Sequence, residues 1–197
     1  MPELTFQEDG HIYRIDGIER PSTTQIIKAA GLSDFSMVRA DVLERARLWG
    51  NAVHKMAELW LKGTIDLLTL DEALFGPLKA LERWYAEHNI GTMSGGQFEI
   101  RGFHPKLLYT GTPDMKFPKL LIDIKSRLDP LAAALQVVAY DEMDGGDREH
   151  RILILNEDGT YDYPRVNATK AKRKESWSRF RYCYDLMKMR EEIAKWK

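Results

Sequence analysis

The stretch from Gly111 to Lys125 constrains the fold most, because it places charged residues among apolar residues that favour β-strands. Side chains two residues apart on a strand share a face, so Asp123 and Lys125 point one way while Ile122 and Ile124 point the other. We therefore expect the isoleucine face to belong to the core. We expect the charged face to open onto water, a metal ion or a substrate.

A tight turn over residues 117–120 (Phe-Pro-Lys-Leu) predicts that 111–117 folds back on 120–126 as a hairpin. Such a hairpin brings Asp114 beside Asp123. Adjacent carboxylates repel each other unless one is protonated or a cation lies between them. All-oxygen ligands suit a hard cation such as Mg²⁺ or Mn²⁺, an arrangement expected for metal-assisted phosphodiester cleavage. The alternative is a surface cluster of salt bridges.

The composition is that of a globular protein. The chain has 197 residues, of which 44% are hydrophobic and 30% charged, and its formal net charge is -1. This balance predicts one domain with a sizeable core and argues against a wholly basic coat, while a local basic patch remains open.

The cysteine content and the apolar runs bear on the compartment. Cys183 is the only cysteine, which excludes an internal disulfide framework, a zinc ribbon and an iron–sulfur cluster held by cysteines of this chain. No apolar run reaches membrane-spanning length, and the first residues lack a signal-peptide pattern. We expect a cytoplasmic protein with no membrane partner.

Hydrophobic periodicity predicts helices first, then strands, then helices again. The predicted elements are a hairpin of 4–7 and 11–15, a helix over 25–30 with N-cap chemistry in 21–24, helices over 37–62 and 71–88, a glycine-rich loop over 89–96, strands over 97–103, 107–117 and 120–126, a helix over 129–143, a strand pair of 151–156 and 160–164, and a helix over 168–197. This order predicts one α/β domain over 1–197 with a central mixed β-sheet flanked by helices. The hairpin and helices occupy 1–96, the sheet and its helix 97–164, and the last helix 168–197.

Four residues outside the hairpin are candidates to join it. His54 lies within the long helix, four residues after Gly50, and Glu99 lies in the first of the three consecutive strands. Gln136 and Tyr140 are four residues apart on the next helix and therefore share a face.

At these residues the chain resembles the PD-(D/E)XK nuclease superfamily, through Pro113-Asp114 and the triplet 123–125 (Asp-Ile-Lys). Gly50 with His54, and Gln136 with Tyr140, are similar to motifs of its RecB-like exonuclease branch. The stretch 21–24 (Pro-Ser-Thr-Thr) is similar to phage members and to relatives of the mitochondrial genome maintenance exonuclease. The resemblance implies a restriction-endonuclease-like core. CRISPR-associated members often carry an iron–sulfur cluster, which a chain with one cysteine lacks.

The resemblance also implies roles for these residues. Asp114, Asp123 and the Ile124 main-chain carbonyl would bind one or two Mg²⁺ or Mn²⁺ ions, with His54 as a nitrogen ligand. Glu99 would complete a second metal position or position water, and Lys125 would orient the attacking water and stabilise charge on the phosphate.

The remaining candidates, Gln136 and Tyr140, would support the site or contact substrate. Ordinary structural uses of His54, Glu99, Gln136 and Tyr140 remain the alternatives.

Contacts to DNA require cations or helix N-termini. The candidates are Ser22 and Thr23 at a helix N-terminus, Arg39, Arg45 and Arg47 around the first long helix, and Lys172, Arg173 and Arg179 in the last helix. A solvated charged face is the alternative for the last helix. The helical spacing of its aromatic residues Trp177, Phe180 and Tyr184 predicts core packing rather than stacking on bases.

The resemblance therefore implies a metal-dependent DNA exonuclease of phage or bacterial recombination, replication or repair, acting on single- or double-stranded ends. The alternatives are a non-catalytic nucleic-acid-binding accessory protein and a structure-selective endonuclease. A recombination or single-strand-binding partner, the oligomeric state and the polarity of digestion remain open.

Overall fold

The computed structural model describes residues 2–32 and 39–196. Three strands open the chain: β1 (Leu4–Gln7), β2 (Ile12–Ile15) and β3 (Ile18–Arg20), paired antiparallel in that order. The hairpin of β1 and β2 confirms the prediction. The strand β3 was not predicted, although Asp16-Gly17 is a strong turn signal and both residues have positive φ.

A mixed sheet forms the centre of the molecule, in the strand order β10-β9-β8-β7-β4, with β11 also paired to β9. The strand β8 (Leu120–Lys125) runs parallel to β9 (Glu149–Leu155), and the other pairs are antiparallel. The short strands are β7 (Met115–Lys116), β10 (Tyr161–Asp162) and β11 (Arg165–Val166). Met115 pairs with Ile122, which confirms the predicted hairpin.

The two strands predicted before β8 are each broken in two. The first becomes β4 (Gln97–Phe98) and β5 (Gly102–Phe103), and the second becomes β6 (Thr110–Gly111) and β7. Between β4 and β5, Glu99 has a φ of 51°, which ends the extended backbone. Between β6 and β7, Pro113 lacks an N–H for a ladder bond. Consequently β5 and β6 form a separate two-stranded sheet, and Glu99 lies outside any strand.

The helices follow the predicted order with different ends. They are α1 (Thr23–Ala29), α2 (Ala40–Leu61), α3 (Phe75–Glu87), α4 (Pro130–Glu142) and α5 (Lys170–Ala194), with the single turns η1 (Glu72–Leu74) and η2 (Ile90–Thr92). The predicted start of the long helix at residue 37 lies outside the described residues. Ser22 and Asp129 cap α1 and α4 through their side chains.

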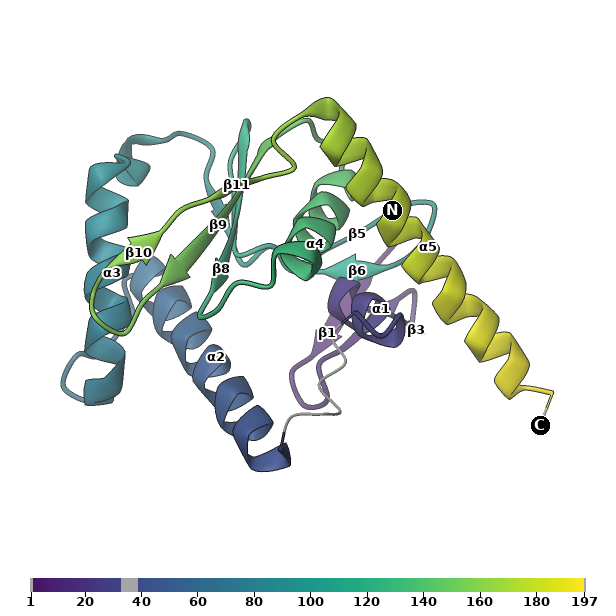
Figure 1. Ribbon diagram of the computed structural model, residues 1–197, viewed down its shortest axis with the longest axis horizontal. Coiled ribbons are helices and arrows are strands. Elements are labelled where there is room, and N and C mark those ends of the chain that lie inside the picture. The colour runs from purple at the N-terminus through teal and green to yellow at the C-terminus, as the bar shows by residue number, and fades with distance from the viewer. Residues whose placement is uncertain (1, 33–38, 197) are drawn as a thin grey trace.

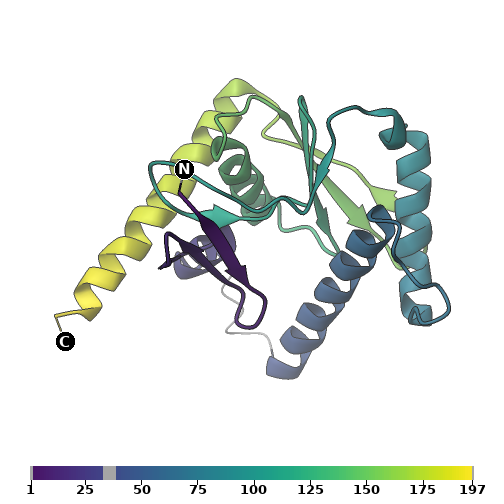
Figure 2. The same cartoon turned by 180° about the vertical axis from the view of Figure 1, so that it is seen from behind.

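Helices cover both faces of the central sheet, so the molecule has three layers (Figures 1 and 2). The helices α2 and α3 pack against Ile122 and Ile124 of β8 on one face. The helices α1, α4 and α5 pack against Leu121 on the other face, where Phe180 is buried and Trp177 and Tyr184 lie against the core, as their spacing predicts. In the described residues, no helix combines the length and apolarity that crossing a membrane requires.

Candidate functional site

A cavity of about 530 Å³ lies where α2, β8, α4 and the N-terminal strands meet. It collects eight of the candidate residues from the sequence: Ser22, His54, Glu99, Asp114, Asp123, Lys125, Gln136 and Tyr140. These residues come from positions between 22 and 140, so only the tertiary fold brings them together.

Asp114 and Asp123 form the floor of this cavity. Their exposed fractions are 6% and 2%, so both side chains are buried, and the charged face of β8 opens onto this cavity rather than onto bulk water. The Ile124 N–H donates to Asp114 Oδ2 at 2.5 Å across the hairpin. This bond holds the Asp114 carboxylate beside β8.

Each aspartate has a basic neighbour. His54 Nδ1 on α2 lies 3.4 Å from Asp114 Oδ1, and Lys125 Nζ lies 2.7 Å from Asp123 Oδ2. The contact between Lys125 and Asp123 is an ion pair whose angles fall outside those of a hydrogen bond. No described residue donates a hydrogen bond to this buried Asp123 oxygen. Asp123 Oδ2 is therefore a buried acceptor that receives no hydrogen bond.

Glu99 is held at the cavity by a strained backbone. Its N–H donates to the Asp114 carbonyl at 3.0 Å, and its φ of 51° is unusual for a residue other than glycine. Burial, with the Asp114 carboxylate as the next cause, raises the pKa of Glu99 to about 8. The fold thus holds a third carboxyl group against the aspartate pair.

The charges of the cluster shift one another's pKa values. Burial raises the pKa of Asp123; Lys125 opposes this rise and Asp114 adds to it, leaving a raised pKa. Burial acts on Asp114 in the same direction, but His54, Lys125 and the Ile124 N–H outweigh it and lower its pKa. Burial lowers the pKa of His54, but Asp114 outweighs burial and the result is a raised pKa. Asp114 therefore adds to the raised pKa of both Asp123 and Glu99, a repulsion between carboxyl groups that an added cation would relieve.

Gln136 and Tyr140 lie on the α4 wall as their spacing predicts. The Gln136 side-chain amide donates to the Tyr140 hydroxyl at 2.7 Å. Burial, followed by the Asp123 carboxylate, raises the pKa of Tyr140 well above its ordinary value. Tyr140 therefore remains a neutral phenol that can position another group.

The donor set fits a hard divalent cation. It offers carboxylate oxygens, one of them buried without a hydrogen bond, and a histidine nitrogen. In the part of the chain that the structure describes, no three His, Cys, Asp or Glu side chains are already grouped for a shared metal ion. Metal binding would have to exchange the His54–Asp114 and Lys125–Asp123 contacts for metal contacts.

The residues expected to contact DNA lie mostly away from this cavity. Ser22 lines it, but its hydroxyl caps α1 by accepting from the Gln25 N–H at 3.2 Å. Thr23 is fully buried and donates to the Thr110 carbonyl. A phosphate at these two hydroxyls would have to replace those bonds.

The expected arginines are engaged with acids. Arg39 and Arg45 pair with Asp41, and Arg47 pairs with Glu44, all on the exposed first turns of α2. In α5, Arg179 pairs with Glu175 and Lys172 is exposed. Arg173 bonds the buried Asp141 and also Asp147 at 2.9 Å, so its guanidinium links α5 to the body of the protein.

Several residues that line the cavity were not predicted from the sequence. Asn51, His54, Lys55 and Glu58 form one polar stripe of α2 that faces the cavity. Their spacing of three, four and seven residues is the signal that could have identified Lys55 and Glu58.

His11 and Tyr13 carried no comparable signal. Tyr13 is buried, and its hydroxyl bonds Thr112 at 2.8 Å, so the N-terminal sheet forms one wall of the cavity.

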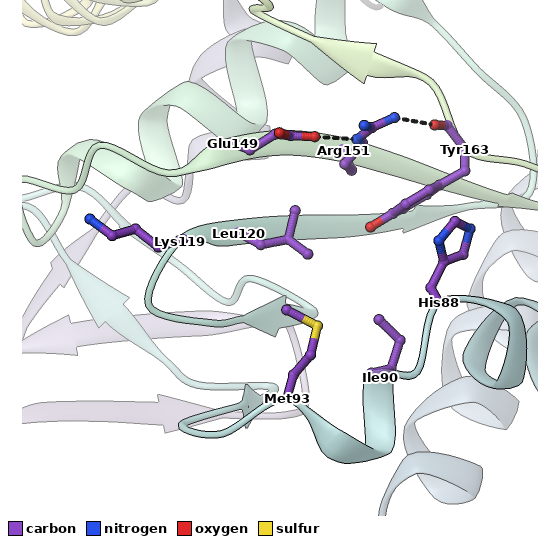
Figure 3. Close-up of a pocket in the computed structure, with 8 residues that line it drawn as sticks. All are labelled: His88, Ile90, Met93, Lys119, Leu120, Glu149, Arg151 and Tyr163. Carbon is purple, nitrogen blue, oxygen red and sulfur yellow. Dashed lines mark hydrogen bonds and ion pairs between the residues drawn. The ribbon is translucent and has the colours of Figure 1, made fainter.

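A second, smaller cavity of about 240 Å³ lies at the other end of β8, beside Leu120 (Figure 3). Its arginine, Arg151, is held by Glu149 at 2.5 Å and by the Tyr163 carbonyl at 3.0 Å. Because these contacts already engage the guanidinium, this cavity is a weaker candidate site.

No protein-family model matches the chain, and a comparison with curated proteins finds no match.

Proposed function

We propose that this protein is a metal-dependent deoxyribonuclease, with a restriction-endonuclease-like core of the PD-(D/E)XK type. The observation that carries the proposal is the buried pair Asp114 and Asp123 with Lys125 beside it in one cavity. Buried acids with shifted pKa values in a cavity are typical of catalytic sites. The order of helices and strands, and the hairpin that carries the pair, support the core.

The side chains have separable roles in this proposal. Asp114, Asp123 and the Ile124 carbonyl bind one or two Mg²⁺ or Mn²⁺ ions, and His54 supplies a nitrogen ligand. Bound metal supplies a Lewis acid for the phosphate and lowers the pKa of a coordinated water. Lys125 orients the water that attacks phosphorus and stabilises negative charge as the bond to the leaving oxygen breaks. Glu99 positions the attacking water or accepts a proton from it, and Tyr140 positions the phosphate.

The test is digestion of end-labelled DNA with Mg²⁺ or Mn²⁺. We expect Asp123→Asn and Lys125→Met each to reduce the rate by about a thousandfold, because each removes a group that acts on developing charge. The matched control is Asp129→Asn, an exposed aspartate outside the cavity. Unchanged rates in both site variants, with the fold verified by circular dichroism, would contradict the proposal.

Linear and circular DNA distinguish the modes of cleavage. An exonuclease degrades the linear form and leaves a covalently closed circle intact. Cutting of the circle would identify an endonuclease instead. Labels at the 5′ or 3′ end of single- and double-stranded substrates then give polarity and strand preference.

A non-catalytic accessory protein is the second candidate, favoured by the His54–Asp114 and Lys125–Asp123 contacts, which already give each aspartate a basic neighbour within the chain. Calorimetric titration with Mn²⁺ separates the two. A nuclease binds Mn²⁺ in the wild type and loses this heat in Asp123→Asn. Absence of binding, even with DNA present, would support the accessory function.

A further inference from the structure

The outward face of α5 carries an apolar stripe outside the candidate site. Its members are Tyr182, Leu186, Met189 and Ile193, with Trp196 just past the helix end. Their exposed fractions lie between 37% and 85%, although each is a large apolar side chain. Contiguous exposed apolar residues of this kind mark interaction surfaces.

The spacing of the stripe is that of a coiled coil. Steps of four, three, four and three residues alternate from Tyr182 to Trp196, which is the a/d pattern of a heptad repeat. The Trp196 N–H still bonds the Ile193 carbonyl at 3.1 Å, so the backbone turn continues to that residue. The apolar stripe of α5 is therefore two heptads long.

The stripe does not compete with the contacts that hold α5 to the protein. Phe180, Cys183 and Met187 form the buried face of α5 and join the core that includes α1 and α4. At 3.6 residues per turn, the centre of the stripe lies roughly 130° around the helix from the centre of that buried face. Figure 1 shows the C-terminal end of α5 extending beyond the rest of the molecule.

Charged residues beside the stripe indicate which helix would pack against it. Asp185 flanks it at a g position and Arg190 at an e position. In a parallel pair of helices, a g residue meets the e residue five positions later on the partner, so Asp185 faces Arg190 of a second copy. An antiparallel pair would set Asp185 against acidic g residues such as Glu192. Arg190 also donates to the Ala29 carbonyl, which leaves other guanidinium donors for this pair.

We propose that the α5 stripe is the interface of a parallel, two-fold symmetric dimer of this chain. A seam of two heptads gives an association that depends on protein concentration. This proposal is independent of the proposed nuclease activity, because none of the stripe residues lines the candidate cavity.

Sedimentation velocity over about a hundredfold range of concentration tests the dimer. We expect a shift from one to two chain masses in the wild type. We expect Ile193→Glu to raise the dissociation constant at least about tenfold, because the two-fold axis places two copies of Ile193 in the seam. The matched control is Ala194→Glu, an exposed neighbour on another side of the helix that leaves association unchanged.

A charge reversal tests the orientation at low salt. Asp185→Lys weakens a parallel dimer, and the double variant Asp185→Lys/Arg190→Glu restores it. Stronger association of Asp185→Lys would show an antiparallel pair and overturn the parallel arrangement. A wild type that remains monomeric at every concentration, or an Ile193→Glu variant that dimerises as well as the wild type, would overturn the interface. Thermal unfolding verifies that each variant is folded.

Discussion

Gly111 illustrates how a single residue shapes the candidate site. A Cβ atom at this position would lie 2.5 Å from Tyr140 Cε1 and 3.0 Å from Tyr140 Cδ1. The ring of Tyr140 is buried and bonded to Gln136, so it has little freedom to move away. Gly111 is therefore needed for close packing at the cavity wall, beyond any flexibility that it gives the strand.

We predict that Gly111→Ala lowers the free energy of unfolding by about 1–3 kcal/mol, the usual cost of overpacking a tight site. Urea unfolding measures this value. Gly102→Ala is the matched control, because Gly102 pairs with Gly111 across β5 and β6 while its Cβ would meet only Met143 Sδ at 3.5 Å. Equal losses in the two variants would show that the Tyr140 contact is not the cause.

At the scale of elements, Asp129 determines where α4 begins. Its carboxylate accepts from the Leu131 and Ala132 N–H groups at 3.1 Å each, and Pro130 occupies the first helical position. We predict that Asp129→Ala lowers the free energy of unfolding by about 1 kcal/mol, measured in urea, because the first N–H groups lose their acceptor. Asp129→Asn keeps an acceptor oxygen, so a comparable loss in that variant would argue against capping.

At the scale of the whole molecule, Asp141 joins three elements. This α4 residue is fully buried and bonds His150 of β9 at 2.9 Å, Arg148 at 2.7 Å and Arg173 of α5. Burial on its own would raise the pKa of Asp141, but the bonds from His150 and Arg148 outweigh burial and lower it. The carboxylate is therefore more stable in the folded than in the unfolded chain.

We predict that Asp141→Asn lowers the free energy of unfolding by about 3 kcal/mol at neutral pH, because it removes a fully buried carboxylate that Arg148, Arg173 and His150 share. The folded pKa lies below the unfolded value of 3.8, so the wild-type advantage is complete above that pH and declines as pH falls below it. Urea unfolding at neutral pH and near pH 3 measures the decline.

Asp147→Asn is the control for this prediction. Asp147 contacts the same Arg173 at 2.9 Å, but its side chain is 85% exposed, so we expect a change below about 0.5 kcal/mol. A difference between wild type and Asp141→Asn that stays constant down to pH 3 would contradict the role assigned to the Asp141 charge.

Local patterns in the sequence determined where many of the strands and helices of this protein lie. Alternation around Ile122 and Ile124 predicted β8 and its hairpin, and capping residues such as Asp129 predicted helix starts, because both signals depend on neighbours within one turn or strand. The hairpin alone predicted that Asp114 lies beside Asp123.

Only the tertiary structure decided the rest. The tertiary structure broke the first of the predicted strands at Glu99, buried both aspartates, and brought α2 and the N-terminal sheet to the same cavity. It also engaged Arg173 with Asp141 and left the α5 stripe exposed. Burial and ion pairing depend on which distant elements pack together, and a local pattern carries no information about that packing.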